Sequence, residues 1–227
     1  MELGIDTSTG YASVSLSDSG ELVKQKTWLS KRNHSVELLP AISSMVENVG
    51  AALDDLDVVF VASGPGSFSS VRVGVTTAKG IASGLKIPIV GIPTADIERF
   101  PYSELNTEVS VFLPAGRGRV YRIDYQKSQT DNQNRVELIY FQRDEISIHE
   151  DQIVCGESVQ DLVSAGVIED SINVKNIVPP TRSLSSMISL GWRRFKEGAV
   201  DDSAVLEPIY VQSSQIDSAE KARLKNQ

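Results

Sequence analysis

The chain has 227 residues, of which 41% are hydrophobic and 23% are charged, proportions typical of folded globular proteins. Its formal net charge of −8 argues against a protein that grips a nucleic-acid backbone unaided, because phosphate binding requires a basic surface. The single cysteine, Cys155, excludes an internal disulfide, and no apolar run approaches the roughly 20 residues of a membrane span. We therefore expect a cytoplasmic protein, and the acidic N-terminus predicts no signal peptide.

The first half of the chain has three short strands followed by alternating helices and strands. In chain order we predict strands at 3–6, 11–17 and 21–29, a helix with apolar positions from Leu38 to Val49, a strand at 58–62, a helix from Val71 to Leu85 and a strand at 87–92. A hairpin turn at 18–20 predicts antiparallel pairing of the first strands. Pro40 interrupts the first helix, which either starts there or kinks one turn in. Strands joined through a helix are expected to pair in parallel, through a right-handed crossover.

The second half repeats this order. We predict strands at 109–113, 120–125 and 136–141, a polar turn at 128–134, a helix over about 158–165, a strand at 172–178, and a helix marked by Leu184, Met187, Ile188 and Trp192. Two lobes, each with a mixed α/β sheet made of a three-strand antiparallel meander and helix–strand units, are typical of the two-lobe actin-like ATPase, or ribonuclease H-like, fold. We expect an N-terminal lobe at 1–98 and a smaller lobe at 99–227. From Ser213 onward the tail is predicted to be a short helix or disordered.

A glycine-rich turn stands between the apolar strand at 58–62 and the helix that follows it. Gly64, Pro65, Gly66 and Ser67 would expose backbone N–H groups near a helix N-terminus, which suits an anion or the close approach of another backbone. The spacing matches neither the dinucleotide fingerprint nor the phosphate loop ending in Gly-Lys-Ser/Thr. An anion site and a purely structural turn are both consistent with this motif.

Asp6, Thr7 and Ser8 follow the first strand, at the position of the first phosphate loop of actin-like ATPases. A carboxylate there would bind Mg²⁺ through water, while hydroxyl and N–H groups would meet phosphate. However, neither of the two residues after Asp6 is glycine. Asp6 could equally cap its own turn at the end of a strand, so the loop is interpreted as at most a vestige of a phosphate loop.

Other catalytic chemistry has little support in the sequence. The only histidines, His34 and His149, stand in different halves, and no paired metal-ligand spacing occurs. His34 begins a helix, where a surface or interface position is expected, and His149 lies in an acidic loop and should be solvated. Cys155 has no evident histidine partner. We expect no catalytic residues, no metal and no cofactor.

The two helices of the first half carry apolar or small residues on more than one face. Gly80 and Gly84 would permit the close approach of another helix. An exposed apolar patch of this kind usually marks an interface. The alternative is that the second lobe or the C-terminal segment covers it.

Several motifs occur in an order that resembles one protein family. They are Ile5-Asp6-Thr7-Ser8, His34-Ser35-Val36-Glu37-Leu38-Leu39-Pro40, Gly64-Pro65-Gly66-Ser67-Phe68 with Val71-Arg72-Val73-Gly74, Ala78-Lys79-Gly80, Ile89-Val90-Gly91-Ile92 and Pro208-Ile209-Tyr210. Together they resemble the TsaB (YeaZ) family, the glycoprotease-like subunits of bacterial tRNA threonylcarbamoyladenosine biosynthesis. The resemblance is strong over residues 1 to about 95 and thin afterwards, apart from the Pro208-Ile209-Tyr210 motif. The glycine-rich segment is shared with the catalytic paralogue TsaD, but this chain has Thr94 and Glu98 where the paralogue has its His-x-x-x-His metal pair.

The resemblance implies an actin-like fold without catalysis of its own. Family members form a heterodimer with TsaD, which TsaE, an ATPase, joins, and they form homodimers through the same two helices. The assembly transfers a threonylcarbamoyl group to the adenosine 3′ of the anticodon in tRNAs that read codons starting with A, so the chain would meet tRNA only within the complex. The interface residues expected on this basis are Leu38, Leu39, Ile42, Val75, Ala78, Lys79 and Ala82.

The chain departs from the family pattern at two places. Ser69-Ser70-Val71 replaces the usual Thr-Gly-Leu, and the segment 114–121 lacks the acid and the glutamate that commonly open the second lobe. Two other function classes remain open. One is an ATP-using actin-like enzyme, which Mg²⁺-dependent nucleotide binding would favour. The other is a metallopeptidase, which the missing metal ligands disfavour.

Overall fold

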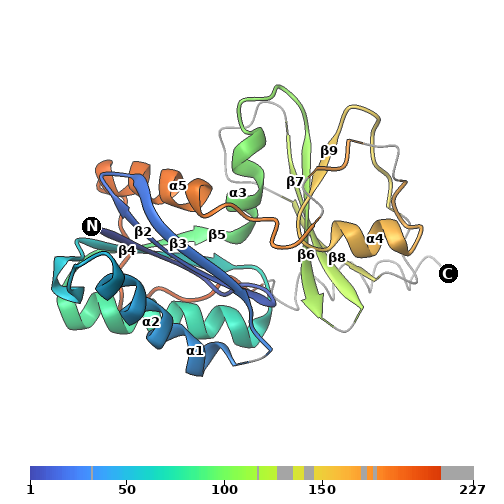
Figure 1. Cartoon of the computed structure of the whole chain (residues 1–227). Coiled ribbons are helices and arrows are strands. Elements are labelled where there is room, and N and C mark those ends of the chain that lie inside the picture. The colour runs from blue at the N-terminus through green and yellow to red at the C-terminus, as the bar shows by residue number, and fades with distance from the viewer. Residues whose placement is uncertain are drawn as a thin grey trace.

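The computed structural model of the chain describes residues 1–31, 33–116, 118–126, 135–140, 146–169, 173–175 and 178–210. Two sheets stand side by side, each with helices against it (Figure 1). This is the two-lobe α/β architecture predicted from the sequence.

The first sheet has five strands in the order β3-β2-β1-β4-β5. Their bounds are β1 Glu2–Asp6, β2 Tyr11–Asp18, β3 Glu21–Leu29, β4 Val58–Gly64 and β5 Ile89–Pro93. The first three strands pair antiparallel, whereas β4 pairs in parallel with β1 and β5 in parallel with β4. The predicted meander followed by parallel strands is therefore confirmed.

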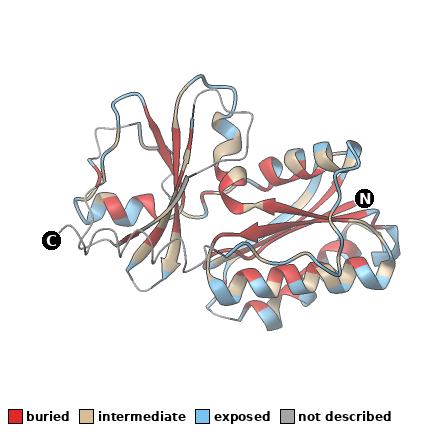
Figure 2. Ribbon diagram, turned by 180° about the vertical axis from the view of Figure 1, so that it is seen from behind, coloured by how far each residue is buried: buried red, intermediate tan, exposed pale blue. Residues whose placement is uncertain are grey.

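Helices cover both faces of the first sheet (Figures 1 and 2). On one face lie α1, His34–Asn48, and α2, Phe68–Leu85; on the other lie α5, Leu184–Lys196, and the short α3, Thr94–Arg99. Strand β4 is buried throughout, because Val59 and Val61 pack toward α1 and α2 while Val58 and Phe60 pack toward α5. It contains the apolar strand that the sequence predicts at 58–62.

Helix α1 begins at His34, upstream of Pro40, and the proline lies inside it. The interpretation in which the helix starts at Pro40 is therefore wrong. His34 is also not a surface residue, since its exposed fraction is only 5%.

The second sheet has the order β8-β7-β6-β9. Its elements are β6 Val109–Gly116, β7 Arg119–Tyr125, β8 Arg135–Tyr140 and β9 Ile153–Cys155, and α4 Val159–Ser164 packs on it. The antiparallel β6–β7–β8 meander is confirmed, and β9 adds a short parallel strand that sequence reasoning missed. The turn at 128–134 lies outside the described residues, as does part of the predicted strand at 172–178. Of that strand, Val174 forms an isolated bridge with Val154.

The chain returns to the first lobe after the second sheet. Helix α5 packs on the first sheet, and the C-terminal segment 199–210 then runs beside β5 and α2 (Figure 1). Asp201 bridges to Ile89, and the Ile209 amide donates to Ser63 O at 2.7 Å. The division at residues 98 and 99 stays a prediction, to which the structure adds that 184–210 pack with the first lobe. Residues 213 onward lie outside the described part. No described helix combines the length and apolar character of a membrane span.

Candidate functional site

The candidate site lies between the lobes, where β1, β4 and β5 end. Because parallel strands place their carboxyl ends at one edge of a sheet, the turns after these strands lie together there. Asp6 ends β1, Gly64 ends β4, and Thr94 follows β5. The sequence-predicted Asp6 turn and glycine-rich turn are thus brought side by side.

The glycine-rich turn packs against the turn after β1. The Gly64 amide donates to Thr94 Oγ1 at 3.1 Å, and the Ser67 amide donates to Ser8 O at 2.7 Å. Gly64 has a φ of 100°, which glycine adopts without strain. Gly66 lies so close to Ser8 that a Cβ built on it would be 2.2 Å from Ser8 O. This geometry favours the structural interpretation of the turn over an anion site.

The polar groups of the Asp6 turn also bond within the protein. Asp6 Oδ1 accepts hydrogen bonds from the Ser8 amide at 2.8 Å and from Ser8 Oγ at 2.6 Å. Thr7 Oγ1 donates to Ser70 O at 2.6 Å. The Asp6 carboxylate, the Ser8 amide and the hydroxyls of Thr7 and Ser8 are therefore already engaged by the chain itself.

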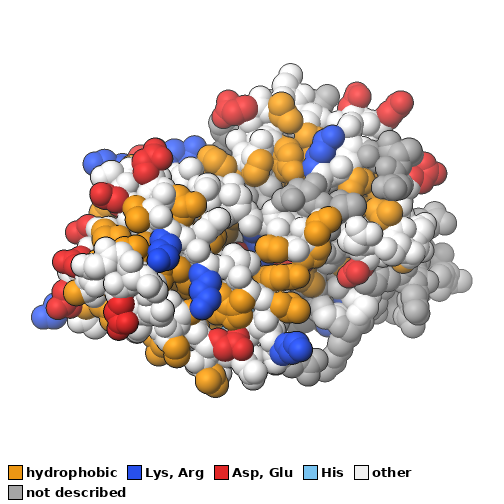
Figure 3. Space-filling view, viewed as in Figure 1, with side chains coloured by type: hydrophobic (Ala, Val, Ile, Leu, Met, Phe, Trp, Pro, Cys, Tyr) orange, Lys and Arg blue, Asp and Glu red, His pale blue; other side chains and the backbone are white. Residues whose placement is uncertain are grey.

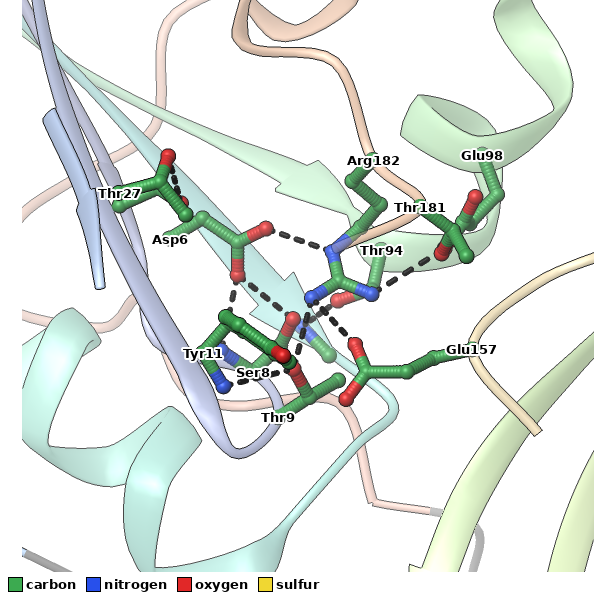
Figure 4. A network of polar contacts seen from close by, with 12 residues as sticks. Asp6, Ser8, Thr9, Tyr11, Thr27, Thr94, Glu98, Glu157, Thr181 and Arg182 are labelled. Atoms are coloured by element: carbon green, nitrogen blue, oxygen red, sulfur yellow. Dashed lines mark hydrogen bonds and ion pairs between the residues drawn. The ribbon is translucent and has the colours of Figure 1, made fainter. Parts of the chain in front are cut away.

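A buried arginine enters this turn from the far end of the sequence (Figure 4). Arg182 Nε lies 2.7 Å from Asp6 Oδ2, Nη1 lies 3.1 Å from Glu98 Oε1, and Nη2 lies 3.2 Å from Glu157 Oε2. Nη2 also donates to Thr9 Oγ1 at 2.9 Å. The side chain of Arg182 is only 4% exposed. We call these four charged residues and Thr9 the Arg182 cluster.

Sequence reasoning missed Arg182, Glu157 and the role of Glu98. Glu98 stands in the sequence where the catalytic paralogue has a metal ligand, but here it accepts hydrogen bonds from Arg182 and from Thr181 Oγ1. No spacing motif connects these residues. The Pro179-Pro180-Thr181-Arg182 stretch, a cation after two prolines, was the only local sign of a fixed arginine.

Within the cluster, the pKa of Asp6 is lowered and the pKa of Glu98 is raised. Burial alone would raise the pKa of Asp6, but the Arg182 charge and the Ser8 hydrogen bonds outweigh it and hold that pKa below its usual value. For Glu98, burial dominates, and the pKa is raised despite Arg182 and Thr181. The neighbouring carboxylates raise the pKa of Arg182 further, against its own burial. One permanent cation thus faces three carboxyl groups, a charge balance that repels phosphate.

Asp6→Asn tests this charge arrangement through its pH dependence. We expect the variant to lose about 3 kcal/mol of stability at neutral pH, as when one partner of a buried ion pair is removed. Because the folded-state pKa of Asp6 is lowered from 3.8, its stabilisation is complete above that pH and is lost as the pH falls through the folded value. The difference between wild type and variant in urea unfolding should therefore narrow below about pH 4. A difference that stays constant with pH would contradict an ion-pair role.

Metal binding has no support in the described part of the chain. No three His, Cys, Asp or Glu side chains among those residues are placed to hold a metal ion together. His149 is exposed, and burial lowers the pKa of His34. Burial also raises the pKa of the Cys155 thiol, which disfavours the thiolate that nucleophilic chemistry requires.

The residues predicted for a partner interface are mostly in the core. Leu38, Ile42, Val75, Ala78 and Ala82 are each at most 2% exposed, and they pack α1 and α2 against the sheet. In this chain the apolar stripe that carries these five residues faces the sheet, as expected of an amphipathic helix, so their contact with a partner stays a prediction. Lys79 is engaged by the C-terminal segment, since Nζ donates to Leu206 O at 2.9 Å and to Ala204 O at 3.3 Å.

Leu39 is the one predicted interface residue with a freely exposed side chain, at 53%. Val36 lies three residues earlier on the same face of α1 and is 72% exposed. Phe68, at the start of α2, is 55% exposed. The Arg72 guanidinium lies over its ring, with Arg72 Cζ 3.9 Å from the ring centre of Phe68. Apolar side chains are visible over this lobe in Figure 3. Sequence reasoning missed Val36 and Phe68, although both lie in motifs that it singled out.

Together, the two sheets, their helices and the edge where the first sheet meets the second lobe define a two-lobe protein of the actin-like ATPase fold. Two solved structures from Pseudomonas aeruginosa share the fold, one described as YeaZ and one as an uncharacterized protein similar to peptidase YEAZ. Each matches this chain with a TM-score of 0.74 and 21% identity. The match covers 99% of each solved structure; it covers 92% of this chain for YeaZ and 93% for the uncharacterized protein.

The chain belongs to the tRNA N6-adenosine threonylcarbamoyltransferase (TsaD) family, whose sequence profile matches residues 27–149, just over half of its length. Two relatives are named tRNA threonylcarbamoyladenosine biosynthesis protein TsaB. One, from Bacillus subtilis, is 35% identical over 55% of this chain; the other, from Escherichia coli, is 33% identical over 56%. The resemblance to TsaB is thereby confirmed. The chain spans about half the length of these relatives, at 54% and 55%.

Proposed function

We propose that this chain is a non-catalytic subunit of the cytoplasmic machinery that transfers a threonylcarbamoyl group to the adenosine 3′ of the anticodon, in tRNAs reading codons that start with A. It acts as scaffold and activator of a TsaD-like catalytic paralogue. The observation that carries this proposal is the Arg182 cluster, which fills the place where an actin-like enzyme would hold its nucleotide. The relatives named tRNA threonylcarbamoyladenosine biosynthesis protein TsaB support the assignment to that pathway.

The polar groups of the Asp6 turn support a non-catalytic role. Asp6 is occupied by Ser8 and Arg182, and Thr9 Oγ1 accepts from the same guanidinium. A phosphate would have to displace these bonds. It would also have to approach three carboxyl groups, whose only cation in the cluster is the single Arg182 guanidinium. Electrostatic repulsion and lost hydrogen bonds both oppose that exchange.

The charge of the chain supports contact with tRNA only through a complex. A net charge of −8 disfavours binding of a phosphate backbone by the chain alone, because such binding is driven by basic side chains. A catalytic paralogue would supply those side chains and the reacting groups. A TsaE-like ATPase would join the pair, and the chain would form homodimers when alone.

The docking surface on this proposal is the outer side of α1 and the start of α2. Val36, Leu39 and Phe68 project large apolar side chains there, with exposed fractions of 53% or more. Such side chains are typical anchors of protein interfaces. Homodimer and heterodimer would then compete for one surface.

Size-exclusion chromatography with light scattering tests the proposed function. The chain should run as a homodimer alone and convert to a one-to-one complex when the TsaD-like paralogue of the same organism is added. In parallel, calorimetric titration with Mg²⁺-ATP should give no heat of binding. A chain that ignores the paralogue but binds Mg²⁺-ATP would instead be an ATP-binding enzyme in its own right.

Leu39→Arg should weaken both complexes by about 30-fold or more, the effect of losing a 2 kcal/mol interface anchor. Its stability should change by no more than about 0.5 kcal/mol, because the side chain is exposed. Leu105→Arg is a matched control, since Leu105 is 52% exposed and lies outside α1 and α2. Equal binding by the two variants in light scattering would remove Leu39 from the docking surface.

A further inference from the structure

The Arg182 side chain is a buried cation on a stretch of chain that is only partly exposed. Pro180 and Ser183 are exposed, whereas Thr181, directly before Arg182, is buried, and the Arg182 side chain is 4% exposed. The groups around it come from three separate places: the turn after β1, helix α3, and the loop after β9. The arginine thus reaches inward from the surface into a site built by both lobes (Figure 4).

The oxygen atoms of this site match the shape of a guanidinium group. Each of the three nitrogens faces a different carboxylate, at 2.7, 3.1 and 3.2 Å, and Thr9 Oγ1 adds a fourth contact at 2.9 Å. A planar cation with donors around its edge can satisfy acceptors that approach from several sides at once. A compact ammonium group carries the same charge but presents its donors from a single atom.

We propose that the oxygen atoms around Arg182, contributed by both lobes, form a guanidinium-binding site whose ligand is the chain's own Arg182. The side chain acts as a tethered cation that joins the turn after β1, α3 and the loop after β9. The site is therefore an internal ion site filled by a side chain of the same chain. This inference concerns the chain by itself, so it holds whether or not the proposed partner binds.

A divalent metal ion is the competing occupant for such a site. Among the described residues, no three acidic, His or Cys side chains lie close enough to share one metal ion. The carboxylates are spaced around the edge of a guanidinium, and a metal would require them to move together. The site therefore favours a planar monocation over Mg²⁺ or Ca²⁺.

Chemical rescue tests this inference. Arg182→Ala should lower the Tm by about 10 °C, since three buried carboxyl groups lose their cation. Guanidinium chloride, at concentrations well below those that denature proteins, should raise the Tm of this variant. The same concentrations of sodium chloride or magnesium chloride should not. Wild type and Arg193→Ala, which removes an exposed arginine from α5, should show no rise with guanidinium.

The proposal would be overturned if guanidinium did not raise the Tm of a folded Arg182→Ala variant more than sodium does. It would also be overturned if magnesium raised that Tm as much as guanidinium, or more. If that variant does not fold, Arg182→Lys and Arg182→Met decide the question. A tethered cation predicts that Tm falls in the order Arg, Lys, Met, because lysine keeps the charge and loses the planar fit. A methionine variant as stable as the lysine variant would show that Arg182 only fills space.

Discussion

Replacing Ala82 with arginine should abolish folding of the chain, at a cost of about 4 kcal/mol or more. Ala82 is 1% exposed and belongs to the core between α2 and the first sheet. A long, charged side chain cannot fit there without displacing its neighbours, and it would bury an unpaired charge. We expect the variant to be insoluble or to lack a cooperative thermal transition.

Thr76→Arg is the matched control for that experiment. Thr76 lies on the exposed side of the same helix, so the same new side chain meets solvent there. Circular dichroism should show a wild-type transition, with a stability change within about 0.5 kcal/mol. An Ala82→Arg variant that folded normally and lost only partner binding would place Ala82 on an interface instead of in the core.

Ala82 also shows that the faces of a helix cannot be assigned to the core or to a partner from the sequence alone. Helical spacing of apolar residues identified α1 and α2 correctly, and it shows that each helix has a strong apolar stripe. It does not show which stripe faces the sheet and which faces a partner. The structure assigns the regular stripe, with Leu38, Ile42 and Val75, to the core. The outward apolar residues, Val36 and Leu39, stand beside that stripe on α1.

Strand prediction succeeded where the local pattern was strong. The β-branched run 58–62 became β4, and the hairpin at 18–20 joined β2 to β3. It failed for β9, which has only three residues, too few for a periodic signal. The pairing of β9 with β6 depends on contacts across more than 40 residues of chain, which no short window contains.

The Arg182 cluster could not be predicted for the same reason. Arg182 is 176 residues from Asp6 and 84 from Glu98, and its third carboxylate, on Glu157, is 25 residues away. Asp6 was singled out because its position after β1 is locally recognisable. Its cation became visible only once the fold had brought the end of the second lobe back to the first sheet.

The glycine-rich turn was recognisable from sequence, but its two interpretations could be separated only by geometry. Gly66→Ala tests the structural interpretation directly. A Cβ at this position would lie 2.2 Å from Ser8 O and 3.0 Å from Ser8 C, and both are backbone atoms. Relieving the clash would separate the turn from β1 and break the Ser67–Ser8 hydrogen bond of 2.7 Å. We expect a loss of about 3 kcal/mol in urea unfolding.

Gly80→Ala provides the contrast, because a Cβ on Gly80 would meet nothing within 4 Å and the residue lies inside α2. Alanine favours a helix over glycine, so this variant should gain about 0.5–1 kcal/mol. A Gly66→Ala variant as stable as Gly80→Ala would mean that the two turns can move apart freely. In that case the N–H groups of the glycine-rich turn could open to an anion, and the structural interpretation would fail.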